Sequence, residues 1–375
     1  MQPLSLYIHI PWCIKKCPYC DFNSHAVKGN VPENAYIEAL FIDLSHDLER
    51  FNIFNRPIHS IFIGGGTPSL FSPDSFSRLL TGIKQRVNLS DNLEITLEAN
   101  PGTFESGKFS EFRALGINRL SIGIQSFDDA QLQTLGRVHC AQEAVKAAEI
   151  ALQAGFSNFN LDLMFGLPET GQHSSHRDLE TAIGLNPSHI SFYQLTLEAN
   201  TYFYKYPPKL PSDENIFSSQ QQCQQLLAEQ GYDQYEISAY SKPGFECRHN
   251  LNYWQFGDYL GIGAGAHGKI SSASGIVRST KSKNPEQYLA QPRHSDHTSL
   301  ARADLPLEFV MNHLRLKQGF TLEQYRAATG SDKASLEPAL GQCLKDNLLV
   351  LQDGYYRCTE QGWYFLDNIL EKFIC

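Results

Sequence analysis

The alternation of apolar runs with amphipathic stretches limits the folds open to this chain more than any other feature. Roughly the first half contains short runs that are apolar at nearly every position, which is typical of parallel strands buried on both faces. These runs are Leu4–Ile10, Ile61–Ile63, Leu93–Leu97, Leu120–Ile124, Phe159–Met164 and Ile190–Leu195. Stretches with helical periodicity separate them, at about 34–48, 73–86, 107–115, 141–154 and 175–184. Repeated βα units predict an α/β fold whose parallel sheet curves into a full or partial (β/α) barrel.

The second half is predicted to hold two linkers and a separate C-terminal unit. Thr201–Asp213 contains three prolines, and Lys269–Ser299 is polar, so both are expected to be irregular. Beyond about Ala301, three helical patterns precede a hairpin signal at Asp353-Gly354, which suggests a winged-helix-like domain. Eight basic against ten acidic residues make DNA binding unfavourable there. We divide the chain into a barrel domain (1–210), a connecting region (211–299) and a C-terminal winged-helix-like domain (300–375).

Composition excludes several classes of protein. The chain has 375 residues, of which 42% are hydrophobic, so it can build a core. Its net charge of −9 disfavours a general binder of nucleic acid or anionic membranes. The first residues lack the basic and apolar regions of a signal peptide, and no apolar run is long enough to span a bilayer. Nine cysteines, an odd number, indicate a reducing, cytoplasmic environment rather than disulfides.

Three cysteines, Cys13, Cys17 and Cys20, follow the first apolar run with the spacing CxxxCxxC. Three thiolates on one short loop can hold three corners of a [4Fe–4S] cluster and leave the fourth iron open to an amine and a carboxylate. A structural zinc ion is the alternative, but zinc usually takes four ligands in CxxC pairs, and the chain has no second pair. Three buried cysteines without metal are the third alternative. The spacing favours the cluster.

The segment around these cysteines resembles a known superfamily. YIHIPWCIKKCPYC, with Tyr19 before the third cysteine, is similar to radical S-adenosylmethionine (SAM) proteins. Within that superfamily it resembles the branch of oxygen-independent coproporphyrinogen III dehydrogenases and HemW-like heme chaperones, and the resemblance runs across nearly the whole chain. It implies that Cys13, Cys17 and Cys20 bind the cluster and that SAM chelates its open iron. An electron from the cluster can then cleave the sulfonium to a deoxyadenosyl radical.

Polar residues recur where the predicted strands end, which is where βα proteins bind their ligands. Each residue alone is more often a solvated or capping group, and a triple glycine is more often a turn, so only their recurrence is informative. The family resemblance implies that a set of these positions binds SAM, and that some of them serve a second SAM molecule in certain members. The set is Tyr7, Gly65, Gly66, Thr67, Glu98, Gln125, Arg137 and Asp162.

Two departures distinguish this chain from the dehydrogenases. Phe22 occupies the position of their fourth motif cysteine, and almost no arm precedes the cluster. His249-Asn250-Leu251-Asn252-Tyr253-Trp254 instead matches the HNxxYW motif of HemW-like proteins. His249 is therefore predicted to contact heme, because a neutral imidazole can ligate its iron and the aromatic residues can pack on the macrocycle. A His-Asn turn with buried aromatics is also ordinary core structure.

Neighbouring residues offer further candidates. Arg248 can pair with a heme propionate, and Cys247 is either a thiolate ligand or, more simply, a small buried residue. His267 ends a glycine-rich run that we interpret as a tight backbone segment near the active face, and it is a second heme candidate. His9 is expected to be a packed or hydrogen-bonded residue.

The cysteine motif, with what the family resemblance implies, predicts a heme chaperone that carries a [4Fe–4S] cluster and SAM and passes heme to apo-hemoproteins such as respiratory proteins. It leaves open whether the protein is also an enzyme, and a homodimer is compatible with it. The main rival is a coproporphyrinogen III dehydrogenase, in which the radical takes hydrogen from two propionate side chains. A zinc-stabilised interaction protein is the third hypothesis.

Overall fold

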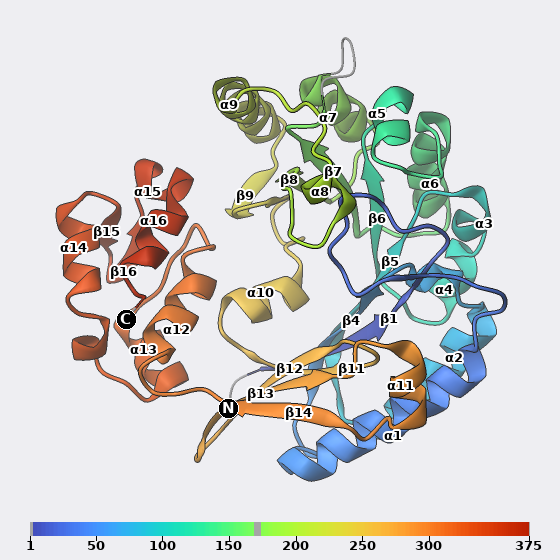
Figure 1. Ribbon diagram of the computed structural model, residues 1–375, viewed down its shortest axis with the longest axis horizontal. Helices are drawn as coiled ribbons and strands as arrows, with labels where there is room; N and C mark the ends of the chain where they lie inside the picture. The colour runs from blue at the N-terminus through green and yellow to red at the C-terminus, as the bar shows by residue number, and fades with distance from the viewer. Residues whose placement is uncertain (1–2, 169–173, 375) are drawn as a thin grey trace.

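One large open sheet forms the body of the molecule (Figure 1). The computed structural model describes residues 3–168 and 174–374. The sheet has the strand order β14-β13-β12-β11-β1-β4-β5-β6-β7-β8-β10-β9, and β14 and β9 form its edges. The central parallel strands are those predicted, and the open edges make the barrel a partial one. They are β1 (Leu4–Ile10), β4 (Ile58–Gly65), β5 (Leu89–Ala99), β6 (Arg119–Gln125), β7 (Phe159–Phe165) and β8 (His189–Gln194).

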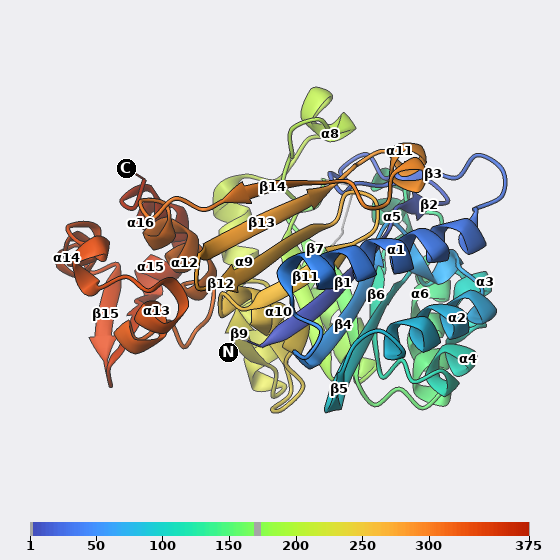
Figure 2. The ribbon, with the colours of Figure 1, turned by 90° about the horizontal axis from the view of Figure 1, so that it is seen from below.

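The predicted helices follow these strands and cover the outer face of the sheet (Figure 1 and Figure 2). They are α1 (Glu33–Phe51), α2 (Pro73–Lys84), α4 (Phe109–Ala114), α6 (Ala141–Gln153) and α7 (Ser175–Gly184). Shorter elements complete this part: β2 (Trp12–Cys13), β3 (His25–Ala26), η1 (Pro68–Leu70), α3 (Thr103–Ser106) and α5 (Asp129–Thr134). Gly116 and Gly155 follow α4 and α6 with φ of 96° and 84°, so the predicted helix-ending glycines are confirmed.

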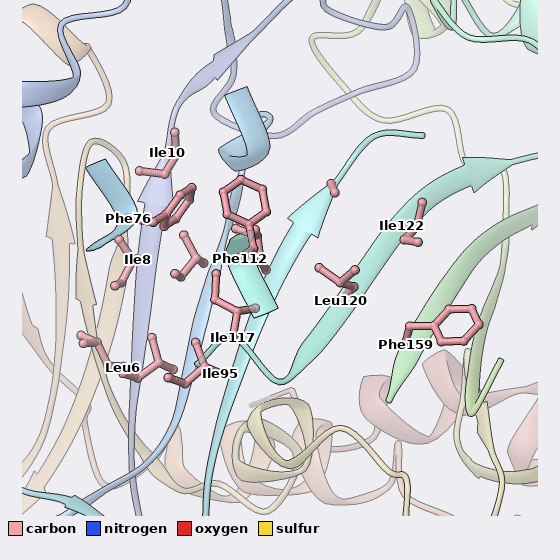
Figure 3. Close-up of a cluster of buried hydrophobic side chains, with 14 of the residues drawn as sticks. Leu6, Ile8, Ile10, Phe76, Ile95, Phe112, Ile117, Leu120, Ile122 and Phe159 are labelled. Carbon is pink, nitrogen blue, oxygen red and sulfur yellow. The ribbon is translucent and has the colours of Figure 1, made fainter. Parts of the chain in front are cut away.

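The two faces of the parallel strands differ in chemistry. Along β1, Leu6, Ile8 and Ile10 belong to the hydrophobic cluster between strands and helices (Figure 3). Burying one such side chain stabilises the fold by about 1.5–3 kcal/mol. Because side chains alternate along a strand, Tyr7 and His9 point to the opposite, concave face. That face carries the polar residues of the barrel.

The predicted irregular linker at Lys269–Ser299 is wrong. This segment contains most of β12 (His267–Ser272), followed by β13 (Gly275–Lys281), α11 (Pro285–Ala290) and β14 (Ser295–Ser299). These antiparallel strands extend the sheet beyond β11 (Asp258–Ile262), which pairs in parallel with β1. Antiparallel strands with one solvated face need few apolar residues, so their polar composition resembled a loop. The other predicted linker, Thr201–Asp213, includes the short helix α8 (Tyr202–Lys205).

A buried ion cluster fixes β13 to the first helix. Lys281 Nζ lies 2.5 Å from Asp43 Oδ1 and 2.9 Å from Asp47 Oδ2, and all three side chains are 0% exposed. The hydroxyl of Tyr288, on α11, donates to Asp43 Oδ2 at 2.8 Å. The three elements α1, β13 and α11 are therefore held by one charged cluster that excludes water.

The C-terminal residues form a second core and cover one edge of the sheet. After α9 (Asp213–Glu229), strands β9 (Asp233–Glu236) and β10 (Ala239–Ser241) end the sheet opposite β14. The amide of Lys317 donates to the carbonyl of Tyr235 at 3.0 Å, and the amide of Ile237 donates to the carbonyl of Arg315 at 3.1 Å. Backbone from the C-terminal part therefore lies along β9.

The predicted elements of this part are largely confirmed. Its helices are α12 (Leu305–His313), α13 (Leu322–Thr329), η2 (Lys333–Leu336) and α14 (Ala339–Lys345). The predicted hairpin joins β15 (Leu349–Gln352) to β16 (Tyr355–Cys358) through Asp353 and Gly354, whose φ values are 52° and 82°. The single closing helix predicted near 361–373 is instead two helices, α15 (Glu360–Tyr364) and α16 (Leu366–Glu371), interrupted at Phe365.

Candidate functional site

The polar residues at the strand ends surround one cavity of about 250 Å³. Seven of the eight residues predicted to bind SAM line it together with the three cysteines. These seven are Gly65, Gly66, Thr67, Glu98, Gln125, Arg137 and Asp162. Tyr7 lies in the neighbouring, larger cavity. The carboxyl ends of β4 to β7 thus bring together residues that are up to about a hundred positions apart in the chain.

The cysteine loop forms one wall of this smaller cavity. Cys13 ends β2, and the amide of Cys20 donates to the carbonyl of Cys17 at 3.2 Å, which closes a turn. Burial raises the pKa of the Cys13 and Cys20 thiols. Among the described residues, no three His, Cys, Asp or Glu side chains converge closely enough to hold a single metal ion. The three thiols line one cavity, as three ligands of a single cluster must.

Two carboxyl groups face the same space. The amide of Gly65 donates to Glu98 Oε2 at 2.9 Å. Burial raises the pKa of Glu98 to about 7; the Gly65 amide opposes this shift, and nearby Asp162 adds to it. Burial likewise raises the pKa of Asp162, against hydrogen bonds from Asn160 and Ser121 that lower it. Because burial disfavours the charged form of both carboxyl groups, a cationic ligand in this cavity would stabilise their ionised forms.

Arg137 and Gln125 line the same cavity. Arg137 donates through Nη2 to Asn100 Oδ1 at 2.6 Å and to the carbonyl of Gly123 at 2.7 Å, while Nη1 lies 3.7 Å from Cys17 Sγ. Gln125 has φ of 72°, which is uncommon for a residue with a side chain, and its Oε1 accepts from the hydroxyl of Tyr193 at 2.6 Å. Such backbone strain persists where surrounding structure enforces it, and it is concentrated at binding sites.

The glycines at the end of β4 are required by the chain's own packing. A Cβ on Gly66 would lie 2.5 Å from the carbonyl oxygen of Trp12, and one on Gly65 would lie 2.6 Å from the ring of His9. The amides of Gly66 and Thr67 donate to the carbonyls of Ile10 and Trp12. The glycine run therefore lies directly against the segment that leads into the cysteine loop.

A second cavity, of about 670 Å³, adjoins the first. Lys16, Phe22, Gly65 and Glu98 line both cavities. Phe22, which replaces the fourth cysteine of the dehydrogenase motif, is 61% exposed. The rest of the lining is largely aromatic and basic. It includes Tyr7, Tyr253, Trp254, Phe256, Tyr259, His267, Lys269, Arg278 and Lys283, with Asn312 from the C-terminal part.

Helix α10 (Arg248–Trp254) carries the HNxxYW residues along one side of the larger cavity. The Glu94 carboxylate accepts from the amides of Arg248 (3.2 Å) and His249 (3.1 Å) and so caps the helix N-terminus. Cys247 is 0% exposed, which supports its interpretation as a small buried residue. Arg248 donates to the carbonyl of Asn92 at 2.5 Å and does not line the cavity, so the structure does not support its pairing with a propionate there.

His249 lies behind the side of the larger cavity that Tyr253 and Trp254 line. It is 1% exposed and is absent from the cavity lining. Its Nδ1 is 3.0 Å from Ser60 Oγ, and its Nε2 is 2.9 Å from the hydroxyl of Tyr253. Burial, with a contribution from Arg119, lowers the pKa of His249 to about 3, so the ring is neutral. Heme contact by His249 stays a prediction.

Sequence reasoning missed four cavity residues: Tyr259 on β11, Lys269 on β12, Arg278 on β13 and Lys283 just after β13. All except Tyr259 belong to the segment that was taken for a linker. The signal that could have found them is a polar residue at every second position. Lys269 and Ser271 have this spacing on β12, as do Arg278 and Thr280 on β13, and Lys269 pairs directly with Arg278. His9 is hydrogen-bonded as predicted, to the Tyr7 hydroxyl and the Asn23 carbonyl.

Comparisons with known proteins agree with this geometry. Residues 7–179 match the family described as the radical SAM superfamily, and residues 300–365 match the HemN C-terminal domain. The heme chaperone HemW of Haemophilus influenzae is 49% identical, over 100% of this chain and 98% of that protein. HemW of Escherichia coli is 46% identical, over 100% and 99%.

The solved structures extend the likeness to the fold. Coproporphyrinogen III oxidase (HemN) from Escherichia coli, described as a radical SAM enzyme, matches with a TM-score of 0.82 at 23% identity over 99% of this chain and 90% of that one. No helix in the described ranges is both long and apolar enough to cross a membrane. The identity to HemW proteins along their whole length shows that the chain belongs to the HemW family of the radical SAM superfamily.

Proposed function

We propose that this protein binds heme in the larger cavity and transfers it to apo-hemoproteins, with a [4Fe–4S] cluster and SAM held in the smaller cavity. The observation that carries the proposal is the larger cavity itself, which is aromatic, rimmed by cations and adjacent to the cysteine loop. The names of the HemW relatives, which are heme chaperones, support it. Respiratory heme proteins are the acceptors that we expect.

The smaller cavity suits the cofactor. Cys13, Cys17 and Cys20 would each hold one iron, and when bound the cluster supplies an electron and an open iron for an amino acid moiety. Glu98 and Asp162 offer carboxylate acceptors for the ammonium or hydroxyl groups of SAM, while Arg137 offers a cation near the cysteine loop. These residues bind and orient SAM.

The larger cavity suits a flat, mostly apolar dianion. Its volume lies within the range of about 300–1,000 Å³ that is usual for small-molecule sites. Tyr253 and Tyr259 meet edge to face, with ring centroids 4.4 Å apart, and present apolar surface to a macrocycle. Lys16 and Lys283 place positive charge at the same cavity, where heme propionates would be stabilised, whereas Arg278 is already ion-paired with Glu308.

The test uses one anaerobically reconstituted sample with two measurements. Hemin titration followed by visible absorbance should saturate at one heme per chain, and incubation with a heme-free acceptor should move the heme to that acceptor. The second measurement incubates the same sample with coproporphyrinogen III, SAM and a reductant. Repeated turnover to protoporphyrinogen, or the absence of saturable heme binding, would refute the chaperone proposal.

A further inference from the structure

Three histidines lie at or behind the wall of the larger cavity, and their ring nitrogens differ in availability. Both nitrogens of His9 are engaged, by the Tyr7 hydroxyl at 2.9 Å and the Asn23 carbonyl at 2.8 Å. Both nitrogens of His249 are engaged as well, by Ser60 and Tyr253. A histidine whose two nitrogens are hydrogen-bonded must break one of those bonds before it can ligate iron.

His267 differs from both. It is solvent-exposed, lines the cavity and stands at the first position of β12. Its Nδ1 is 3.2 Å from the hydroxyl oxygen of Thr280, its cross-strand partner on β13. Within the described chain, Nε2 makes no hydrogen bond. A metal-binding histidine usually has this arrangement, with one nitrogen oriented by a hydrogen bond and the other directed to the metal.

The backbone that carries His267 is firmly placed. The amide of Lys281 donates to the carbonyl of Ala266 at 2.9 Å, and the amide of Gly265 donates to the carbonyl of Ser282 at 2.9 Å. Gly263 packs so closely that a Cβ there would lie 2.4 Å from the carbonyl oxygen of His9. A ligand on a rigid strand holds its geometry better than one on a loop.

From this placement we propose that His267 Nε2 is the axial ligand of heme iron, and that His249 is a positioning residue that holds Tyr253 in the cavity wall. The inference rests on the proposed heme binding and specifies the atom that contacts the iron. The lone pair of the neutral imidazole is donated to iron, so ligation needs neither an oxidant nor a proton acceptor. Lys283, which is exposed and lines the same cavity, offers a cation to a propionate, whereas Lys269 and Arg278 are already ion-paired with Asp258 and Glu308.

The experiment compares histidine variants of the full chain in hemin titrations, with folding checked by circular dichroism. His267→Ala should weaken hemin binding at least ten-fold and remove the imidazole-ligated absorption spectrum. Free imidazole should restore that spectrum in His267→Ala, because it can occupy the space that the side chain leaves. His249→Gln, whose amide can still hydrogen-bond Tyr253, should keep the ligated spectrum. His59→Ala, which removes an exposed histidine away from the cavity, is the control for adventitious binding.

The outcomes separate the ligand from the function. If wild-type protein binds no heme, the proposed function itself fails. If wild-type protein binds heme and His267→Ala keeps its spectrum and affinity, the ligand assignment is wrong. Loss of the ligated spectrum in His249→Gln, with retention in His267→Ala, would assign the iron to His249 instead.

Discussion

The buried Lys281 cluster makes a stability prediction that can be worked from the structure. Lys281→Met keeps the length of the side chain but removes the only cation that the cluster places beside Asp43 and Asp47. Burial already raises the pKa of Asp43 to about 7; Lys281 opposes the shift, and Asp47 adds to it. Removing one partner of a buried ion pair typically costs about 3–5 kcal/mol, because the remaining charge stays desolvated.

The stability that Lys281→Met loses should depend on pH in a defined direction. Without Lys281 the folded pKa of Asp43 rises further, so the folded state holds a proton that the unfolded state, with an ordinary carboxyl pKa of about 4, releases. The variant therefore loses stability as pH rises from about 4 through that folded pKa. We expect a deficit of about 3–5 kcal/mol near pH 8.5 and a clearly smaller one near pH 6.

Urea unfolding of the purified apoprotein, followed by fluorescence at both pH values, measures this deficit. Lys283→Met is the matched control, since Lys283 is exposed and its loss should change stability by no more than about 0.5 kcal/mol. Asp47→Asn added to Lys281→Met should recover part of the loss, because it removes one of the two stranded carboxylates. A deficit that is equal at both pH values, or below about 1 kcal/mol at pH 8.5, would refute the electrostatic reasoning.

Three further predictions concern the smaller cavity. Cys17→Ser should abolish cluster assembly, so iron and sulfide bound after anaerobic reconstitution should fall to near zero; unchanged iron would contradict the three-thiolate site. SAM affinity, measured by equilibrium dialysis, should rise as pH increases through about 7, where Glu98 ionises, and Glu98→Gln should flatten that dependence; an unaltered profile would exclude Glu98 as its source. Gly66→Ala should destabilise the protein by about 2 kcal/mol or more in urea, because its Cβ would lie 2.5 Å from the carbonyl oxygen of Trp12. Gly184→Ala, in α7 with open space around it, should be neutral or stabilising by up to about 1 kcal/mol, and an equal loss in both variants would argue against the steric explanation.

The parallel core was predictable because its signals are local. Strand β1 was predicted at Leu4–Ile10 and α7 at Ser175–Gly184, with the ends that the structure has. Full burial leaves such strands continuously apolar, and amphipathic helices show their period directly. The convergence of Glu98, Gln125 and Asp162 on one cavity also followed from the rule that parallel strands end at one edge of the sheet.

What could not be predicted depends on contacts between distant segments. Lys281 is a lysine in a polar stretch, and only its pairing with Asp43, more than two hundred residues earlier, makes it a core residue. His249 was the natural heme candidate from its motif, yet its burial behind Tyr253 depends on Ser60, which lies on β4, 189 positions earlier in the chain. Such long-range pairs leave no periodic trace in a single sequence.

The two edges of the open sheet have different consequences for a shortened chain. Strand β14 reads Ser-Asp-His-Thr-Ser, and its polar side chains discourage pairing with another molecule. Strand β9 reads Asp-Gln-Tyr-Glu and is covered in addition by the backbone of Arg315 and Lys317. Truncation before residue 300 would leave the Tyr235 carbonyl and the Ile237 amide without these partners and would remove Arg315 from the Glu236 carboxylate, so the cost of shortening the chain would fall on this edge and not on β14.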